Sequence, residues 1–112
     1  MKRFGWVGQL RAECVEKYVR LHAHTWPAVL ARNTSCHLQN YSIYYQQMPS
    51  GEHLLFSYVE YTGDDFATDM QRMAADPEVE CWWAECKPCF ERIGDLPEGE
   101  VWMPMTEVFH QP

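Results

Sequence analysis

The chain has 112 residues, of which 46% are hydrophobic and 14% aromatic. This length suits one small domain, and we expect residues 1–112 to form a single unit with its own apolar core. Nine lysines and arginines stand against sixteen aspartates and glutamates, which gives a formal net charge of -7. An acidic chain lacks the basic surface that nucleic-acid backbones select, so the composition argues against nucleic acid as a partner.

The sequence contains no pattern typical of export or of membrane insertion. No apolar run approaches the roughly 18 residues of a membrane span, and Met1-Lys2-Arg3 is followed by mixed residues rather than by a signal-peptide core. We therefore expect a cytoplasmic protein with no membrane partner. The cysteines number five, which is odd, and in that compartment they are expected to be reduced thiols.

The N-terminal half alternates between strand and helix patterns. Apolar side chains repeat at period two over residues 4–10, which predicts a strand. Val15, Tyr18, Val19 and His22 then fall on one stripe of a helix. A short helix from Pro27 to about residue 32 is expected next, because proline is favoured in a first turn.

A hairpin follows, and then two further helices. Residues 40–45 and 53–61 are rich in aromatic and branched side chains, and a turn signal at residues 49–51 joins them. Apolar residues at positions 66, 70, 73 and 74 predict a helix that begins after Asp64 and Asp65. Asp76-Pro77 is typical of a cap followed by a first helical proline, so a short helix to about residue 86 is expected. Residues 101–109 predict a last strand, which Pro104 confines to an edge or a bulge.

The order β-α-β-β-α-β predicts a split βαβ, or ferredoxin-like, α+β fold with one antiparallel sheet and its helices on one face. The other face of the sheet needs a cover. In so small a domain a second copy of the chain is the simplest cover, so we expect a homodimer of the dimeric α/β barrel type.

Three side chains on the first helix suggest a carbohydrate site. Tyr18, His22 and Trp26 follow one another at one helical turn each. Aromatic faces cover the C–H face of a sugar, and phenol, imidazole and indole groups bond its hydroxyls. The same spacing is also typical of a helix that packs its aromatics into the core. His24 lies roughly 200° around the helix from His22, so we expect it at the surface.

A cysteine cluster offers a rival site. Cys81, Cys86 and Cys89 have the spacing C-x4-C-x2-C, and the last two form a C-x-x-C pair. A redox pair sits at a helix N-terminus, whereas this pair follows a helix. A structural zinc site needs a fourth ligand, which the spacing does not supply. We therefore interpret these cysteines as inert thiols, with a metal site or a thiol switch as alternatives.

Five ordered motifs make the sequence similar to a known family. They are His22-Ala23-His24-Thr25-Trp26-Pro27, Asn40-Tyr41-Ser42-Ile43-Tyr44, Leu55-Phe56-Ser57-Tyr58-Val59-Glu60, Trp82-Trp83 and Glu107-Val108-Phe109. This set resembles the L-rhamnose mutarotase family from about Lys2 to His110.

The resemblance implies a ferredoxin-like dimer that interconverts the α and β anomers of a 6-deoxy sugar without a cofactor or a metal. It implies that His22 is the proton donor and that Tyr18, Tyr41, Trp82 and Trp83 contact the sugar. Relatives with a similar start and a similar entry to the helix at residue 66 act on L-fucose, so both sugars are expected substrates. Two alternatives are a non-catalytic carbohydrate-binding module and a dimeric ferredoxin-like oxygenase, haem-degrading protein or isomerase with another substrate.

Overall fold

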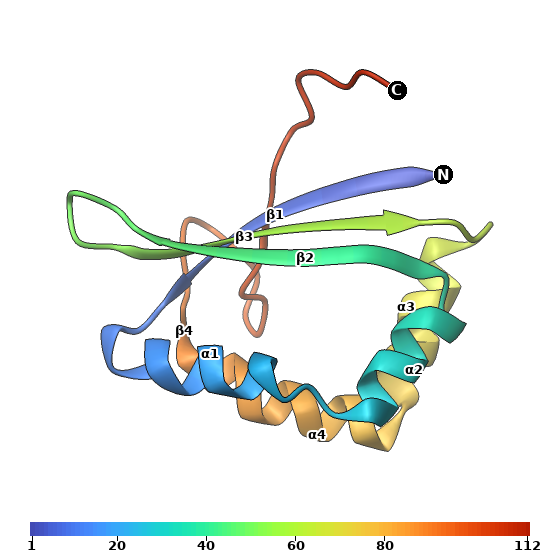
Figure 1. Ribbon diagram of the computed structural model, residues 1–112, viewed down its shortest axis with the longest axis horizontal. Coiled ribbons are helices and arrows are strands. Elements are labelled where there is room, and N and C mark those ends of the chain that lie inside the picture. The colour runs from blue at the N-terminus through green and yellow to red at the C-terminus, as the bar shows by residue number, and fades with distance from the viewer.

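The computed structural model covers residues 1–112 and consists of an antiparallel sheet with all its helices on one face (Figure 1). The elements are, in order, β1 (Lys2–Leu10), η1 (Ala12–Cys14), α1 (Val15–Ala23), α2 (Pro27–Ser35), β2 (Leu38–Gln47), β3 (His53–Tyr61), α3 (Phe66–Ala75), α4 (Pro77–Cys86), η2 (Lys87–Cys89), β4 (Phe90–Glu91) and β5 (Met103–Pro104).

The strand order is β2-β3-β1-β4, and β5 pairs with β1 beside β4. Every strand pair is antiparallel. This order is that of the split βαβ arrangement, so the predicted ferredoxin-like α+β fold is confirmed. None of the helices combines the length and the apolar character that a membrane crossing requires.

The predicted last strand is wrong in its extent. The sequence predicted one strand over residues 101–109, whereas two pieces of two residues each pair with the same edge of β1. Phe90 lies opposite Leu10, and Met103 lies opposite Val7. Pro104 has no N–H to donate, which limits the second piece to a short edge contact.

The predicted cap at Asp76 is present, and Asp65, expected only as a favourable charge near the start of a helix, caps α3. The Asp65 carboxylate accepts a hydrogen bond from the Thr68 N–H at 3.1 Å, and the Asp76 carboxylate accepts one from the Glu78 N–H at 2.8 Å. Each bond satisfies an N–H that the first helical turn leaves free. These caps fix where α3 and α4 begin, and so where their apolar faces lie above the sheet.

Two predicted core positions are instead exposed. Val19 in α1 is 51% exposed, and Ala74 in α3 also faces solvent. Tyr18 is buried, so the buried face of α1 is narrower than the spacing of its apolar residues indicated. In α3 the unexpected buried residue is Asp69, whose carboxylate accepts hydrogen bonds from the Tyr61 hydroxyl at 2.5 Å and from Arg72 at 2.8 Å.

A bulge in β2 decides which side chains of that strand face the helices. Leu38 pairs with Tyr61 and Ile43 pairs with Ser57, both on the inner face, although five positions separate Leu38 from Ile43. Side chains alternate with period two, so an extra residue must lie between them. The register shifts between residues 39 and 42, where Asn40 has φ 48. The bulge thereby turns Tyr41 toward the helical layer.

The sheet face opposite the helices carries Phe56 and Tyr58 of β3 and the Tyr44 side chain of β2, which is 68% exposed. The C-terminal segment leaves the edge of the sheet and runs out on this same side (Figure 1). The expectation that a second copy covers this face stays a prediction.

Candidate active site

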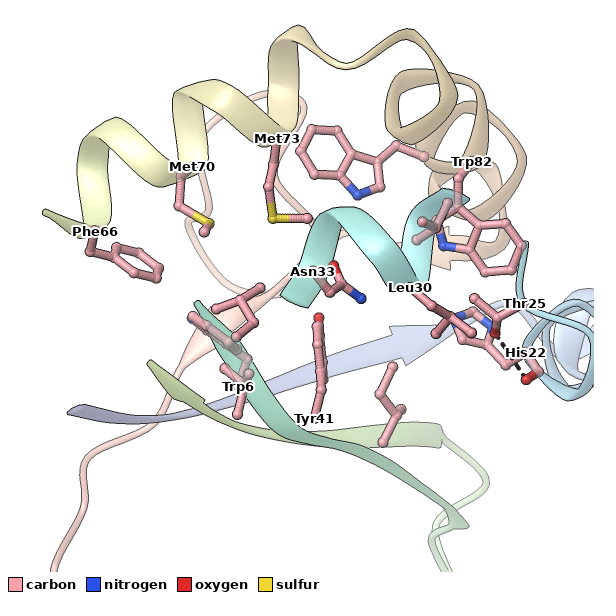
Figure 2. Close-up of a pocket in the computed structure, with 15 residues that line it drawn as sticks. Trp6, His22, Thr25, Leu30, Asn33, Tyr41, Phe66, Met70, Met73 and Trp82 are labelled. Carbon is pink, nitrogen blue, oxygen red and sulfur yellow. Dashed lines mark hydrogen bonds between the residues drawn. The ribbon is translucent and has the colours of Figure 1, made fainter. Parts of the chain in front are cut away.

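A cavity of about 400 Å³ lies between the inner face of the sheet and the helices (Figure 2). Small-molecule sites typically measure roughly 300 to 1,000 Å³, so a monosaccharide is a suitable occupant by size. The three long strands and α2, α3 and α4 supply the wall, and the last turn of α1 closes one end with His22. Twelve of the fifteen lining residues are hydrophobic.

His22 is held on three sides. Its Nδ1 atom lies 3.0 Å from the carbonyl oxygen of Tyr18, one helical turn earlier. Its ring stacks on the Tyr18 ring at 4.1 Å between centroids and meets the Trp82 ring edge-on at 5.1 Å. The Thr25 hydroxyl donates to the His22 carbonyl at 3.1 Å and so fixes the end of α1 (Figure 2). These contacts fix the position of the imidazole at the cavity wall.

The same contacts determine the protonation state of His22. Burial lowers its pKa below the ordinary value of 6.5, and the bond to the Tyr18 carbonyl only partly opposes this. The imidazole is therefore neutral at neutral pH. Because a carbonyl oxygen only accepts hydrogen bonds, Nδ1 carries the proton and Nε2 carries a lone pair. A neutral imidazole with a free Nε2 is suited to taking up a proton.

Tyr18 lies behind His22 rather than in the cavity wall. It is buried at 4% exposure, and its ring also contacts the Phe90 ring edge-on at 5.5 Å. Burial raises the pKa of its phenol, and the nearby Cys86 and Tyr41 raise it further. The phenol is therefore protonated at neutral pH.

Tyr41 rises from β2 into the middle of the cavity (Figure 2). Its side chain is 44% exposed because the cavity is open around the ring. Burial of the hydroxyl end raises its pKa, and the neighbouring Ser57 hydroxyl lowers the pKa by a smaller amount. Ser57 lies in the sheet between Trp6 and Ile43, and its Oγ atom is buried with no hydrogen-bond partner of regular geometry. Sequence reasoning did not single out Ser57.

Trp82 and Trp83 both line the cavity from α4. Trp82 is 6% exposed and packs edge-on against Trp26 at 5.2 Å, so it belongs to the core as well as to the wall. Trp83 is partly exposed, and the Lys87 ammonium lies 5.4 Å from its ring centre. The adjacent indoles therefore form one side of the site, with Trp26 behind them.

Of the five predicted site residues, the structure thus brings His22, Tyr41, Trp82 and Trp83 to one cavity and places Tyr18 beneath the first of them. Sequence reasoning missed further lining residues. Asn33 was interpreted as a loop former after the helix that was expected to end near residue 32, whereas α2 continues to Ser35 and so includes Asn33. Met70 and Met73 were expected only as core residues, because apolar helical spacing is the same for a core and for a cavity wall.

No cysteine lines the cavity. Cys86 and Cys89 are buried, and burial raises the pKa of the Cys86 thiol to about 12. A thiol held in its protonated form is a poor nucleophile and a poor ligand, which favours the interpretation as inert thiols. No three histidine, cysteine, aspartate or glutamate side chains gather in a way that could hold a metal ion. His24 lies at the surface, as predicted.

Comparison with known proteins shows the family of the chain. A model of the L-rhamnose mutarotase family matches residues 3–111. The crystal structure of L-rhamnose mutarotase from Formosa agariphila has a TM-score of 0.75 at 20% identity, covering 100% of both chains. A NIPSNAP family protein from Agrobacterium tumefaciens has a TM-score of 0.54 at 14% identity, covering 80% of this chain and 75% of that one. At these identities the two structures show a shared fold. No curated protein matches the sequence.

The family match identifies the chain as an isomerase of the aldose-epimerase type, built on a ferredoxin-like α+β fold. It belongs to the L-rhamnose mutarotase family, whose model matches almost its whole length.

Proposed function

We propose that the protein is a mutarotase that interconverts the α and β anomers of a 6-deoxy hexose, L-rhamnose first and L-fucose as the alternative, with His22 moving the proton. The observation that carries this proposal is the hydrogen bond from His22 Nδ1 to the Tyr18 carbonyl at 3.0 Å. It leaves a neutral imidazole with a free Nε2 at the wall of an aromatic cavity.

Anomer exchange moves one proton between two oxygens of the same carbon. As the bond from C1 to the ring oxygen breaks, His22 Nε2 takes the proton of the C1 hydroxyl, and C1 becomes an aldehyde. The imidazolium then gives this proton to the former ring oxygen, which becomes a hydroxyl. After rotation about the C1–C2 bond, the same steps in reverse close the ring on the other face of the carbonyl. His22 thus acts as base and then as the proton donor that the resemblance implies.

One positioned acid/base group typically supplies a factor of about 10² to 10⁴ in rate. That factor is adequate here because sugars mutarotate in water without a catalyst. Tyr41 has a raised pKa and keeps its proton, so it is better suited to orienting the sugar by hydrogen bonds than to acting as a base.

The remaining predicted residues have binding roles in this proposal. Trp82 and Trp83 cover the apolar face of the sugar ring, and Tyr41 bonds a hydroxyl at the centre of the cavity. Tyr18 supports the His22 ring. Its hydroxyl is proposed to bond the sugar at the His22 end of the cavity. The apolar wall accepts a sugar that carries a methyl group in place of a hydroxymethyl group.

The test is proton saturation-transfer NMR between the anomeric resonances of L-rhamnose, of L-fucose and of L-mannose. L-Mannose is L-rhamnose with a hydroxyl on its methyl group, so it serves as a matched control for the apolar wall. We expect catalysed exchange of L-rhamnose or L-fucose, and exchange of L-mannose about 10-fold to 100-fold slower than that of L-rhamnose. Binding without catalysed exchange of any of these sugars would instead indicate a non-catalytic binding module.

We also propose that the protein is a homodimer that covers the sheet face bearing Tyr44, Phe56 and Tyr58. Aromatic residues on one open face of a small domain support this assembly. Light scattering coupled to size-exclusion chromatography tests it: a mass of twice 13.2 kDa is expected, and a mass of 13.2 kDa at micromolar concentration would reject it.

A further inference from the structure

The polar groups of the cavity wall are few and have distinct partners. Apart from the hydrophobic residues, the lining consists of His22, Thr25 and Asn33. The Thr25 hydroxyl donates its hydrogen bond to the His22 carbonyl, and His22 Nδ1 donates to the Tyr18 carbonyl. No hydrogen bond joins the Asn33 side chain to another cavity residue (Figure 2). Asn33 therefore brings an amide into an apolar wall without a partner from the chain.

The position of this amide is specific. Asn33 lies on α2, on the same side as Leu30 and Val29, which are three and four residues earlier and also line the cavity. Figure 2 shows its amide directed into the cavity and facing the Tyr41 hydroxyl. His22 lies toward one end of the cavity, and Phe66 and Met70 lie at the other end, so Asn33 is at the middle.

An amide at this position of the cavity wall is unfavourable for the helix and for the wall unless it binds a ligand. Asparagine is a weak helix former, and Asn33 is only partly exposed, so its amide loses part of its hydrogen bonds to water unless a partner replaces them. An apolar residue would suit both the helix and the wall better. A carboxamide has both an acceptor oxygen and a donor NH2 group, so it can bond two adjacent hydroxyls of a sugar at once.

We propose that Asn33 is a specificity-determining residue that binds the hydroxyls at C3 and C4 of the sugar. This inference rests on the proposed mutarotase function, because His22 must then face C1 and the ring oxygen. In a pyranose, C3 and C4 form the edge opposite to the ring oxygen and C1. With C1 at His22, this edge points along the cavity toward Asn33 and Tyr41. L-Rhamnose and L-fucose differ in configuration at C2 and C4, so a residue that binds the C4 hydroxyl distinguishes between them.

The experiment compares the wild type with Asn33→Leu, which has nearly the same shape but no hydrogen-bonding group. Each is assayed by saturation-transfer NMR with the sugar that the wild type exchanges faster and with the 4-deoxy derivative of that sugar. Thr34→Leu on the exposed side of the same helix is the matched control, and circular dichroism checks the folding of all variants.

We expect Asn33→Leu to lower kcat/KM for the parent sugar about 10-fold, chiefly through KM, as loss of one to two hydrogen bonds predicts. For the 4-deoxy sugar the loss should shrink to about 3-fold or less, because the bond to the C4 hydroxyl is already absent and only the bond to the C3 hydroxyl remains to be lost. Thr34→Leu should leave both values unchanged. An equal loss for both sugars would overturn the proposal and assign Asn33 a packing role, as would no loss for either.

Binding is measured separately by titrating tryptophan fluorescence with the same sugars, since Trp82 and Trp83 line the cavity. If the wild type binds the parent sugar without exchanging it, and Asn33→Leu binds it more weakly, the role of Asn33 stands and the mutarotase function is rejected. Equal binding by the two proteins would reject the role of Asn33.

Discussion

The Nδ1 atom of His22 lies 3.0 Å from the carbonyl oxygen of Tyr18. This bond lies within one helix, between positions i and i−4, and it points the other ring nitrogen away from the helix backbone. The Tyr18 ring supports the imidazole from below, at 4.1 Å between ring centres. A single residue thus determines both the tautomer and the orientation of the proposed catalytic group.

The first prediction concerns pH. Because burial lowers the pKa of His22, its basic form persists to a lower pH than that of a free histidine. We expect kcat/KM to be flat at neutral pH and to fall as the pH drops, with an apparent pKa below the ordinary 6.5. The measurement is the anomer exchange rate from pH 4.5 to 8 after subtraction of the buffer rate, with conditions chosen in roughly half-unit steps. A midpoint above the ordinary value would contradict the assignment of His22 as the base.

The second prediction separates the two roles of Tyr18. Tyr18→Phe keeps the ring under His22 and removes the hydroxyl, so we expect a loss of about 3-fold to 10-fold in kcat/KM, the effect of one hydrogen bond. Tyr18→Leu also removes the stacked ring, and we expect a larger loss together with a displaced pH midpoint. If Tyr18→Phe matches the wild type, the hydroxyl has no contact with the sugar.

The third prediction concerns the bulge that turns Tyr41 into the cavity. Asn40 has φ 48, and its side chain donates to the Glu60 carboxylate at 2.7 Å. Asn40→Gly accepts this backbone conformation, so we expect kcat/KM within about 3-fold of the wild type. Asn40→Val is strained there and should lose about 1 to 3 kcal/mol of stability and at least about 10-fold in activity. Thermal unfolding and anomer exchange measure the two effects, and an unaffected Asn40→Val would contradict the role of the bulge.

The fourth prediction concerns stability at low pH. Asp69 accepts hydrogen bonds from Tyr61 at 2.5 Å and from His37 at 3.0 Å, which lower its pKa from 3.8 to about 2. A carboxylate with a depressed folded pKa stabilises the fold above the unfolded value of 3.8, and this stabilisation is lost as the pH falls toward 2. We expect the wild type to have a higher melting temperature than Asp69→Asn at pH 6. This difference in melting temperature should disappear near pH 2. A difference that stays constant would show that the charge of Asp69 does not stabilise the fold.

The order of elements could be predicted from the sequence because each segment has its own local pattern. The β3 bounds agree with the prediction, and the caps at Asp65 and Asp76 follow from local hydrogen bonds. The pairing of β4 and β5 could not be predicted, because it depends on a free edge of β1 that only the folded sheet provides. The exposure of Val19 likewise depends on how much of α1 the rest of the chain covers.

The candidate site, like the fold, could be predicted from the sequence only in part. The motifs around His22, Tyr41 and Trp82-Trp83 pointed to one pocket, and these residues do line one cavity. The direction of Tyr41 depends on an extra residue in β2, which simple alternation does not reveal. Asn33 was missed because its significance comes from the apolar neighbours that the fold places around it.

In the proposed mechanism, His22 moves the proton in anomer exchange. The most direct measurement is the saturation-transfer rate for L-rhamnose and L-fucose with the wild type and with His22→Gln, which keeps an amide near the position of Nε2 but supplies no base. We expect catalysed exchange by the wild type and a fall of about 10² or more in the variant, whose fold circular dichroism should show to be retained. Exchange by folded His22→Gln at the wild-type rate would contradict it.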